Sequence, residues 1–240
     1  MTEVMETISI IRHAEYFSPR MFAQVAPRID VIGAGATGSR ILEELARLTA
    51  GLVEIHVWDF DMIEGHNIAN QKYGKNQIGM LKIEAVAQRI FQDTGVKLVI
   101  HNEKVDGSQM LGQIVFVLVD DLNTTPYSRK AIWEKGLKFK LNTKLVIETR
   151  MGKNHGRVYA VNPSKREHIQ EYENTLEGKV AETSACGSPI SIGATAEIVS
   201  GFALSLMMKW YFVQNGQEGV IMENEVIFST SPFRIMARTF

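Results

Sequence analysis

The sequence has one cysteine, almost no net charge and no long uninterrupted apolar run, and each shortage excludes a class of protein. A single cysteine among 240 residues excludes an intramolecular disulfide and suits a reducing compartment. A formal net charge of -1 gives no electrostatic reason to expect nucleic acid or a membrane surface as a partner. The longest apolar stretch, near 198–213, is interrupted by Lys209, and no basic and apolar leader opens the chain. We therefore expect a cytoplasmic protein that binds neither nucleic acid nor membrane.

Segments with strand and helix character alternate along most of the chain, which predicts an α/β fold. The run 113–120 is so uniformly apolar that it should be a central strand covered on both faces. Alternation of this kind predicts a Rossmann-like, mostly parallel sheet with right-handed crossovers and helices on both faces. Further strands are expected at 28–32, 52–58, 96–105, 144–152 and 156–163, and helices at about 37–49, 79–93 and 124–138.

We expect a single domain over residues 1–240, since a chain of this length with 45% hydrophobic residues can bury a substantial core. Its nucleotide-binding core should span about 28–162. After that the alternation stops: residues 164–188 are polar and are expected to form a loop. A long helix over about 190–213 has apolar residues at helical spacing, which is typical of a core or dimer helix. Short strands over 214–240 complete the predicted domain.

The segment VIGAGATGSRILEELARL, residues 31–48, combines a glycine-rich turn with the start of a helix. In such a turn Gly33 permits the tight bend, Gly35 lets a phosphate approach the backbone, and Gly38 lets helix and strand pack closely. The helix N-terminus then offers unpaired N–H groups and a partial positive charge to an anion. Asp59 follows at the end of the second strand, where a carboxylate can accept hydrogen bonds from ribose hydroxyls. The sequence therefore predicts a nucleotide-binding site.

The chain after Asp59 argues against a dehydrogenase. A nicotinamide-binding fold usually re-enters a helix soon after this acid, whereas here about twenty residues of mostly polar loop intervene. Lys82 then falls in the first turn of the next helix, where a cation opposes the helix macrodipole. This position favours an electrostatic role for Lys82 over that of a solvated surface lysine.

Together these segments resemble the ThiF/MoeB/HesA adenylyltransferases, relatives of the ubiquitin-activating enzymes. The matching segments, in order, are GAGATGS, DFDMIEGHNIANQ, GMLK and an apolar strand that ends in Asp. The resemblance covers roughly residues 16–213. It implies an ATP-dependent enzyme that activates a carboxylate as an acyl adenylate and releases pyrophosphate. The expected substrate is the C-terminus of a small ubiquitin-like or sulfur-carrier protein.

The resemblance also implies a role for each matching position. Asp59 would hold the ribose, Lys82 would contact the phosphates, and Asp120 would hold Mg2+ beside the reacting phosphate. Arg20 resembles an arginine that reaches into the site of the partner subunit in a homodimer. Cys186 resembles a cysteine that can form a covalent link to the carrier. The residues expected to bind ATP are Gly33, Gly35, Gly38, Asp59, Asp61, Asn67, Asn70, Gln71, Lys82 and Asp120.

The chain departs from the family pattern at several positions. Asn70 stands where the family's Asn-x-x-Arg-Gln segment has arginine, so one positive charge near the triphosphate is missing. Arg20, Lys72 or Lys75 could supply a substitute. The family's Asp-Asn pair is Asp-Asp here, and an insertion displaces Arg129. The two Cys-x-x-Cys pairs that hold zinc in many members are absent, so no zinc is expected.

These residue types fit the adenylation of a carboxylate. The negative charge of a carboxylate makes it a poor electrophile, and a mixed anhydride with AMP supplies a good leaving group. Mg2+ on Asp120 and the ammonium group of Lys82 would neutralise the departing pyrophosphate. Two other functions stay open: an NAD-binding Rossmann oxidoreductase, and a nucleotide-binding partner protein without catalysis.

Overall fold

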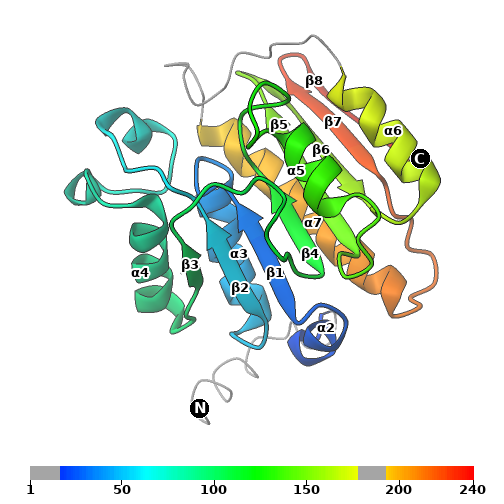
Figure 1. Cartoon of the computed structure of the whole chain (residues 1–240), viewed down its shortest axis with the longest axis horizontal. Helices are drawn as coiled ribbons and strands as arrows, with labels where there is room; N and C mark the ends of the chain where they lie inside the picture. Colours follow the sequence, from blue (N-terminus) through cyan, green and yellow to red (C-terminus); the bar gives the residue numbers. More distant parts are fainter. Residues whose placement is uncertain (1–16, 178–192) are drawn as a thin grey trace.

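The computed structural model of the chain describes residues 17–177 and 193–240. Its centre is an eight-stranded sheet with the strand order β3-β2-β1-β4-β5-β6-β7-β8 (Figure 1). The first five strands in this order are parallel, and the last three continue the sheet in antiparallel fashion. This arrangement confirms the predicted Rossmann-like α/β fold. The strands are β1 (Arg28–Ile32), β2 (Glu54–Trp58), β3 (Val99–His101), β4 (Ile114–Val117), β5 (Leu145–Met151), β6 (His155–Val161), β7 (Glu225–Thr230) and β8 (Phe233–Arg238).

Helices cover both faces of the sheet (Figure 1). One face carries α2 (Pro19–Val25), α3 (Gly38–Thr49), α4 (Lys82–Thr94) and α7 (Gly193–Gln214). The other face carries α5 (Arg129–Ile132), its continuation as a π-helix η4 (Trp133–Leu137), and α6 (Arg166–Leu176). Two short 3-10 helices, η2 (Gly65–Ala69) and η3 (Lys75–Gln77), lie in the long loop after β2.

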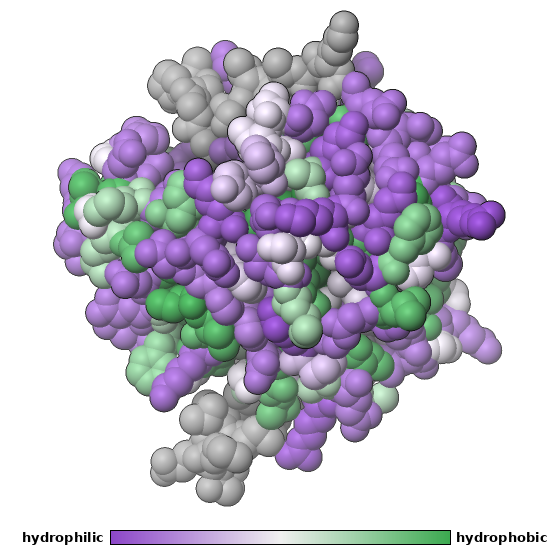
Figure 2. Space-filling view, in the orientation of Figure 1, coloured by the Kyte–Doolittle hydropathy of each residue, from purple (hydrophilic) through white to green (hydrophobic). Residues whose placement is uncertain are grey.

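The hydrophobic pattern explains where the core lies. All four residues of β4 are buried, so the prediction of a central strand covered on both faces is confirmed. The helix α7 is long and apolar enough to cross a membrane by length and composition, but more than half of its most apolar part is buried inside the structure. It packs along β5 and β6, as a core helix does. On the face shown in Figure 2 hydrophilic residues predominate, and the hydrophobic ones form separate areas.

Three predicted elements differ from the structure. The predicted loop over 164–188 contains helix α6, which buries Ile169, Tyr172 and Leu176 on one side. The polar residues between these three, Glu171 and Glu173 among them, obscured their helical spacing. The helix expected from residue 124 begins only at Arg129, because the Asp121 side chain binds the preceding turn. The strand expected over 96–105 is reduced to the three residues of β3. Cys186 lies outside the described residues.

Candidate functional site

A cavity of about 620 Å³ lies at the carboxyl ends of the parallel strands. Its walls come from the glycine turn after β1, the long loop after β2, the loop after β3, the loop after β4, and the last residues of β5. Ligands of open α/β sheets bind at this edge, where the chain leaves neighbouring strands in opposite directions. The order β2-β1-β4 places such a switch point between β1 and β4.

The glycine turn has the geometry that its sequence predicts. Gly33 has φ +103°, and a side chain there would come within 3.1 Å of the Leu118 carbonyl oxygen. A Cβ atom on Gly38 would stand 2.0 Å from the Gly33 carbonyl oxygen, so only glycine fits where α3 packs under the turn. Gly33 and Gly35 line the cavity, whereas Gly38 supports the turn from beneath.

Asp59 braces this turn. Its Oδ2 accepts a hydrogen bond of 2.6 Å from the Ala34 amide, and its Oδ1 accepts one of 2.8 Å from the Asp61 amide. Burial raises the pKa of Asp59 above its usual value, although these two amides and Lys82 act in the opposite direction. The carboxylate therefore joins the glycine turn to the start of the long loop, and it also lines the cavity.

Lys82, the first residue of α4, points into the cavity beside Asp61. The Lys82 Nζ lies 2.7 Å from Asp61 Oδ2, and the Lys82 amide donates to the Asp61 carbonyl oxygen at 2.9 Å. The lysine side chain is 9% exposed, whereas that of Asp61 is 48% exposed. The pair is therefore buried on the lysine side and open to the cavity on the acid side.

The three amides of the Asn-Ile-Ala-Asn-Gln segment are all buried, in different surroundings. Asn67 lines the cavity and its Oδ1 accepts a hydrogen bond of 2.8 Å from the Glu64 amide. Gln71 lines the cavity, with an Oε1 that has no partner within the described part of the chain. Asn70 is not part of the cavity wall, and its carbonyl oxygen accepts a 2.8 Å hydrogen bond from Arg40 Nη1.

Asp120 and Asp121 both line the cavity but are held differently. The carboxylate of Asp121 accepts hydrogen bonds from Thr124 and from the Thr125 amide, at 2.7 to 2.9 Å, and so fixes its own loop. Asp120 is exposed, and no residue in the described ranges binds its side chain. Of the two acids, Asp120 is thus the one whose oxygens can bind a metal or a ligand.

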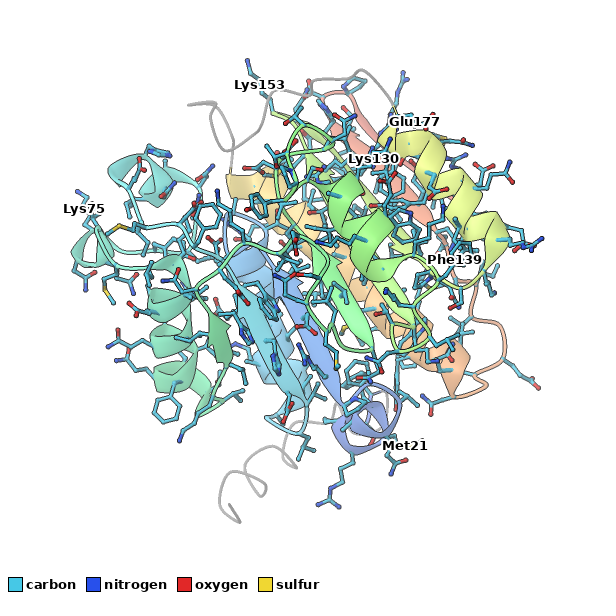
Figure 3. All side chains as sticks on the ribbon, viewed as in Figure 1. Met21, Lys75, Lys130, Phe139, Lys153 and Glu177 are labelled. Atoms are coloured by element: carbon cyan, nitrogen blue, oxygen red, sulfur yellow. The ribbon has the colours of Figure 1, made fainter. Side chains whose placement is uncertain are left out.

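None of the three proposed substitutes for the missing arginine lines the cavity. Arg20 is exposed on α2, which precedes β1 and so lies at the opposite end of the strand. The Lys72 Nζ lies 3.1 Å from Glu197 on α7. Lys75 projects away from the body of the molecule at its edge (Figure 3).

The cavity wall also carries cationic side chains that the sequence did not place there. Two of them were not predicted at all, and Arg129 was expected to be displaced by the insertion before it. Arg129, despite the insertion before it, lines the cavity together with Arg150 from β5 and Lys104 from the loop after β3. A glutamate in the apolar strand LVIET was the one signal in the sequence, because a charged residue inside a buried strand needs partners.

That glutamate, Glu148, organises both arginines. It is fully buried, with its Oε1 2.6 Å from Arg150 Nε and 3.2 Å from Arg129 Nη1. The Tyr172 hydroxyl donates a further hydrogen bond to Glu148. Burial alone would raise the pKa of Glu148, but the charges of Arg150 and Arg129 outweigh it and hold this pKa below its usual value. Arg129 is fixed a second time, by a 2.6 Å hydrogen bond from its Nε to the Val119 carbonyl oxygen.

In the described ranges, no group of three or more His, Cys, Asp or Glu side chains is arranged to hold a metal ion by itself. Mg2+ in nucleotide sites commonly takes only one or two carboxylates and completes its shell with phosphates and water. Asp120 fits that lesser requirement, since it lines the cavity and its side chain has no partner among residues 17–177 and 193–240.

The comparisons with known proteins give a family from one source and a fold from another. The model of the ThiF family matches residues 23–234. Among solved structures, E. coli MccB with ATP shares 13% identity at a TM-score of 0.66, over 92% of this chain and 66% of MccB. E. coli MccB with MccA-N7isoASN gives the same values. PaaA shares 15% identity at a TM-score of 0.67, over 99% of this chain and 71% of PaaA. The chain thus spans just under two thirds of MccB, and no curated protein matched it.

Proposed function

The chain belongs to the ThiF family, and on that premise we propose that it is an ATP-dependent adenylyltransferase that activates a carboxylate. The observation that carries the proposal is the convergence of the glycine turn, Asp59 and the Lys82–Asp61 pair on one cavity. The fold similarity to MccB, which has been solved with ATP, supports a nucleotide in this position.

The glycine turn, Asp59, Lys82 and Asp120 each have a task in this reaction. The amides of the glycine turn and the start of α3 would bind the phosphates, and Asp59 would accept hydrogen bonds from the ribose. Lys82 would exchange Asp61 for a phosphate oxygen and stabilise the charge that develops on the departing pyrophosphate. Asp120 would hold Mg2+, which supplies further neutralisation of the phosphates when it is bound. The substrate carboxylate forms a bond to the α-phosphorus while the bond from that phosphorus to pyrophosphate breaks.

The proposal includes a homodimer with a shared site. Arg20 lies at the amino end of β1 and the cavity at its carboxyl end, about 16 Å further along the strand. An arginine placed there can serve a cavity only in another copy of the chain. This placement supports the expectation that Arg20 completes the site of the partner subunit.

The acyl substrate is proposed to be the C-terminus of a small ubiquitin-like or sulfur-carrier protein. MccB has been solved with MccA, which supports a small substrate partner for this fold. ATP use and the single cysteine both fit a cytoplasmic location. In a second step, the thiolate of Cys186 would attack the acyl carbon of the adenylate. This step would join the carrier to Cys186 by a thioester and release AMP.

Cys186 has its own test. Wild-type protein incubated with ATP, Mg2+ and the carrier should give a thiol-sensitive adduct in the mass spectrum. Cys186→Ser should lose this adduct while it keeps pyrophosphate exchange. If Cys186→Ser passes the carboxylate on at the normal rate, the acyl adenylate itself is the species that is handed on.

Exchange of labelled pyrophosphate into ATP tests the proposed function. With Mg2+ and a synthetic peptide that ends in Gly-Gly, we expect exchange that depends on the peptide. ATP binding without exchange for any tested carboxylate would favour a non-catalytic partner protein. Tight binding of NAD without ATP turnover would favour an oxidoreductase.

A further inference from the structure

Two exposed aromatic rings stand around one lysine at the cavity. The Lys104 Nζ lies 4.1 Å from the ring centre of Phe60 and 5.1 Å from that of Tyr127. The two aromatic residues are 46% and 41% exposed. All three side chains line the cavity. Within the roles assigned above to the turn, the acids and Lys82, none of the three has a task.

The three side chains come from three separate strand ends. Phe60 follows β2, Lys104 follows β3, and Tyr127 lies between β4 and α5. The loop that carries Tyr127 is held from within, because the Tyr127 amide donates to Thr125 Oγ1 at 3.2 Å and the Thr125 amide donates to Asp121 at 2.8 Å. The ring of Tyr127 therefore stands on a fixed loop and contacts the mobile end of the Lys104 side chain.

Their position relative to Asp59 indicates what they bind, and this step rests on the proposed function. If the ribose lies on Asp59, the base attached to it must lie within one sugar ring of that carboxylate. Phe60 is the next residue in the chain, and the other two side chains adjoin it. A nucleobase offers two uncharged π faces, on which aromatic side chains stack favourably.

We propose that Phe60 and Tyr127 grip the base of the nucleotide by stacking, and that Lys104 yields the space between them. The cation–π contact keeps the two rings apart before the nucleotide arrives. Once displaced, the Lys104 ammonium can donate to a ring nitrogen of a purine. The two rings bind the base, whereas Lys82 and the glycine turn bind the phosphates.

Calorimetric titration with two probes separates base binding from phosphate binding. ATP carries both groups, and inorganic tripolyphosphate carries only the phosphates. Base stacking on one aromatic ring is worth about a 5- to 140-fold change in affinity. We therefore expect Tyr127→Leu to weaken ATP binding by that factor and to leave tripolyphosphate binding within about twofold. Phe60→Leu should act in the same direction, and Tyr127→Phe, the matched control that keeps the ring, should bind ATP nearly as wild type does.

The two probes distinguish stacking of the rings on the base from a role of the rings in the shape of the loop alone. An equal loss of ATP and tripolyphosphate affinity in Tyr127→Leu would mean that the ring only shapes the loop, which would overturn the inference. Unchanged ATP affinity in both Tyr127→Leu and Phe60→Leu would overturn the inference and leave the proposed function standing. Failure of the wild-type protein to bind ATP would overturn both. Melting temperatures of the variants within a few degrees of wild type would show that the fold is intact.

Discussion

The two walls of the cavity hold their charges in different ways. On the wall formed after β1 and β2, Lys82 pairs with Asp61, whose side chain is 48% exposed, so a phosphate oxygen can replace the acid. On the wall formed after β4 and β5, Arg129 and Arg150 are fixed by the fully buried Glu148. Replacing Asp61 by another anion costs little free energy because Asp61 is exposed, whereas removing the buried Glu148 from its arginines costs much more. The Lys82–Asp61 pair is therefore suited to binding and reaction, whereas Glu148 and its two arginines hold the cavity in shape.

Glu148→Gln should show the largest effect, and it should be on stability. The change leaves the buried Arg129 and the partly buried Arg150 without their shared counter-charge, and breaking a buried ion pair commonly costs about 3–5 kcal/mol. The free energy of unfolding in urea measures it. Glu134→Gln is the matched control, because Glu134 pairs with Lys130 at the surface and its loss should cost less than about 1 kcal/mol.

The same glutamate should impose a pH dependence. The arginine charges hold the pKa of Glu148 below its unfolded value, so its contribution is complete above the unfolded pKa and is lost as the pH falls through the folded pKa. The wild-type protein should thus lose stability in acid more steeply than Glu148→Gln does. Parallel acid limbs in the two proteins would contradict the assignment of this wall as structural.

Lys82→Met should reduce activity strongly and stability little, whereas Glu148→Gln should mainly reduce stability. We expect pyrophosphate exchange to fall by about 10²- to 10³-fold, because a charge that meets the reacting phosphates is removed. The melting temperature should change little, since Asp61 is left open to solvent. Lys75→Met, at the outer edge of the molecule in Figure 3, is the control and should retain full exchange. If Lys82→Met kept most of its exchange, the first wall would not be the reactive one.

Gly38→Ala should reduce the stability of the protein, by less than Glu148→Gln does. It tests whether the glycine turn of the first wall needs glycine at this position. Its Cβ would meet the Gly33 carbonyl oxygen at 2.0 Å, and such overpacking costs about 1–3 kcal/mol. Gly201→Ala in α7 is the control. Nothing stands within 4 Å of a Cβ at that position, so helix propensity should add up to about 1 kcal/mol. Thermal melts of the two variants should therefore shift in opposite directions.

The smallest expected effect is a recovery of activity in mixed subunits. Arg20→Ala and Lys82→Ala proteins should each be inactive, but a mixed dimer would hold one site with both wild-type groups. Random mixing of equal amounts predicts about a quarter of wild-type exchange. No recovery, with subunit exchange confirmed by labelled protein, would place Arg20 outside the site.

Sequence reasoning located the first wall better than the second. The glycine turn, Asp59 and Lys82 lie at the ends of successive elements, so their spacing along the chain predicts that they meet at one edge of the sheet. On the second wall, only Asp120 was predicted in the same way, because the apolar run before it forms the central strand β4. Patterns of this kind lie within short segments and can be recognised in a single sequence.

The second wall depends on contacts between distant segments. The contacts join α5, β5 and α6, through Arg129, Glu148 and Tyr172. No local pattern around any one of these residues predicts its contact with the other two. The loop predicted over α6 hid Tyr172, and the insertion before Arg129 obscured its place in the cavity. Lys72 and Lys75 were reasonable candidates by charge and proximity, yet the fold directs them to α7 and to the outer edge.

The most direct test of the account is the identity of the products formed from ATP. Phosphorus NMR can follow ATP with Mg2+, the Gly-Gly peptide and the wild-type or Lys82→Met protein. We expect AMP and pyrophosphate, because the carboxylate attacks the α-phosphorus, and we expect Lys82→Met to form them at least about 10²-fold more slowly. Formation of ADP and phosphate by the wild-type protein, at a rate that Lys82→Met leaves unchanged, would contradict it.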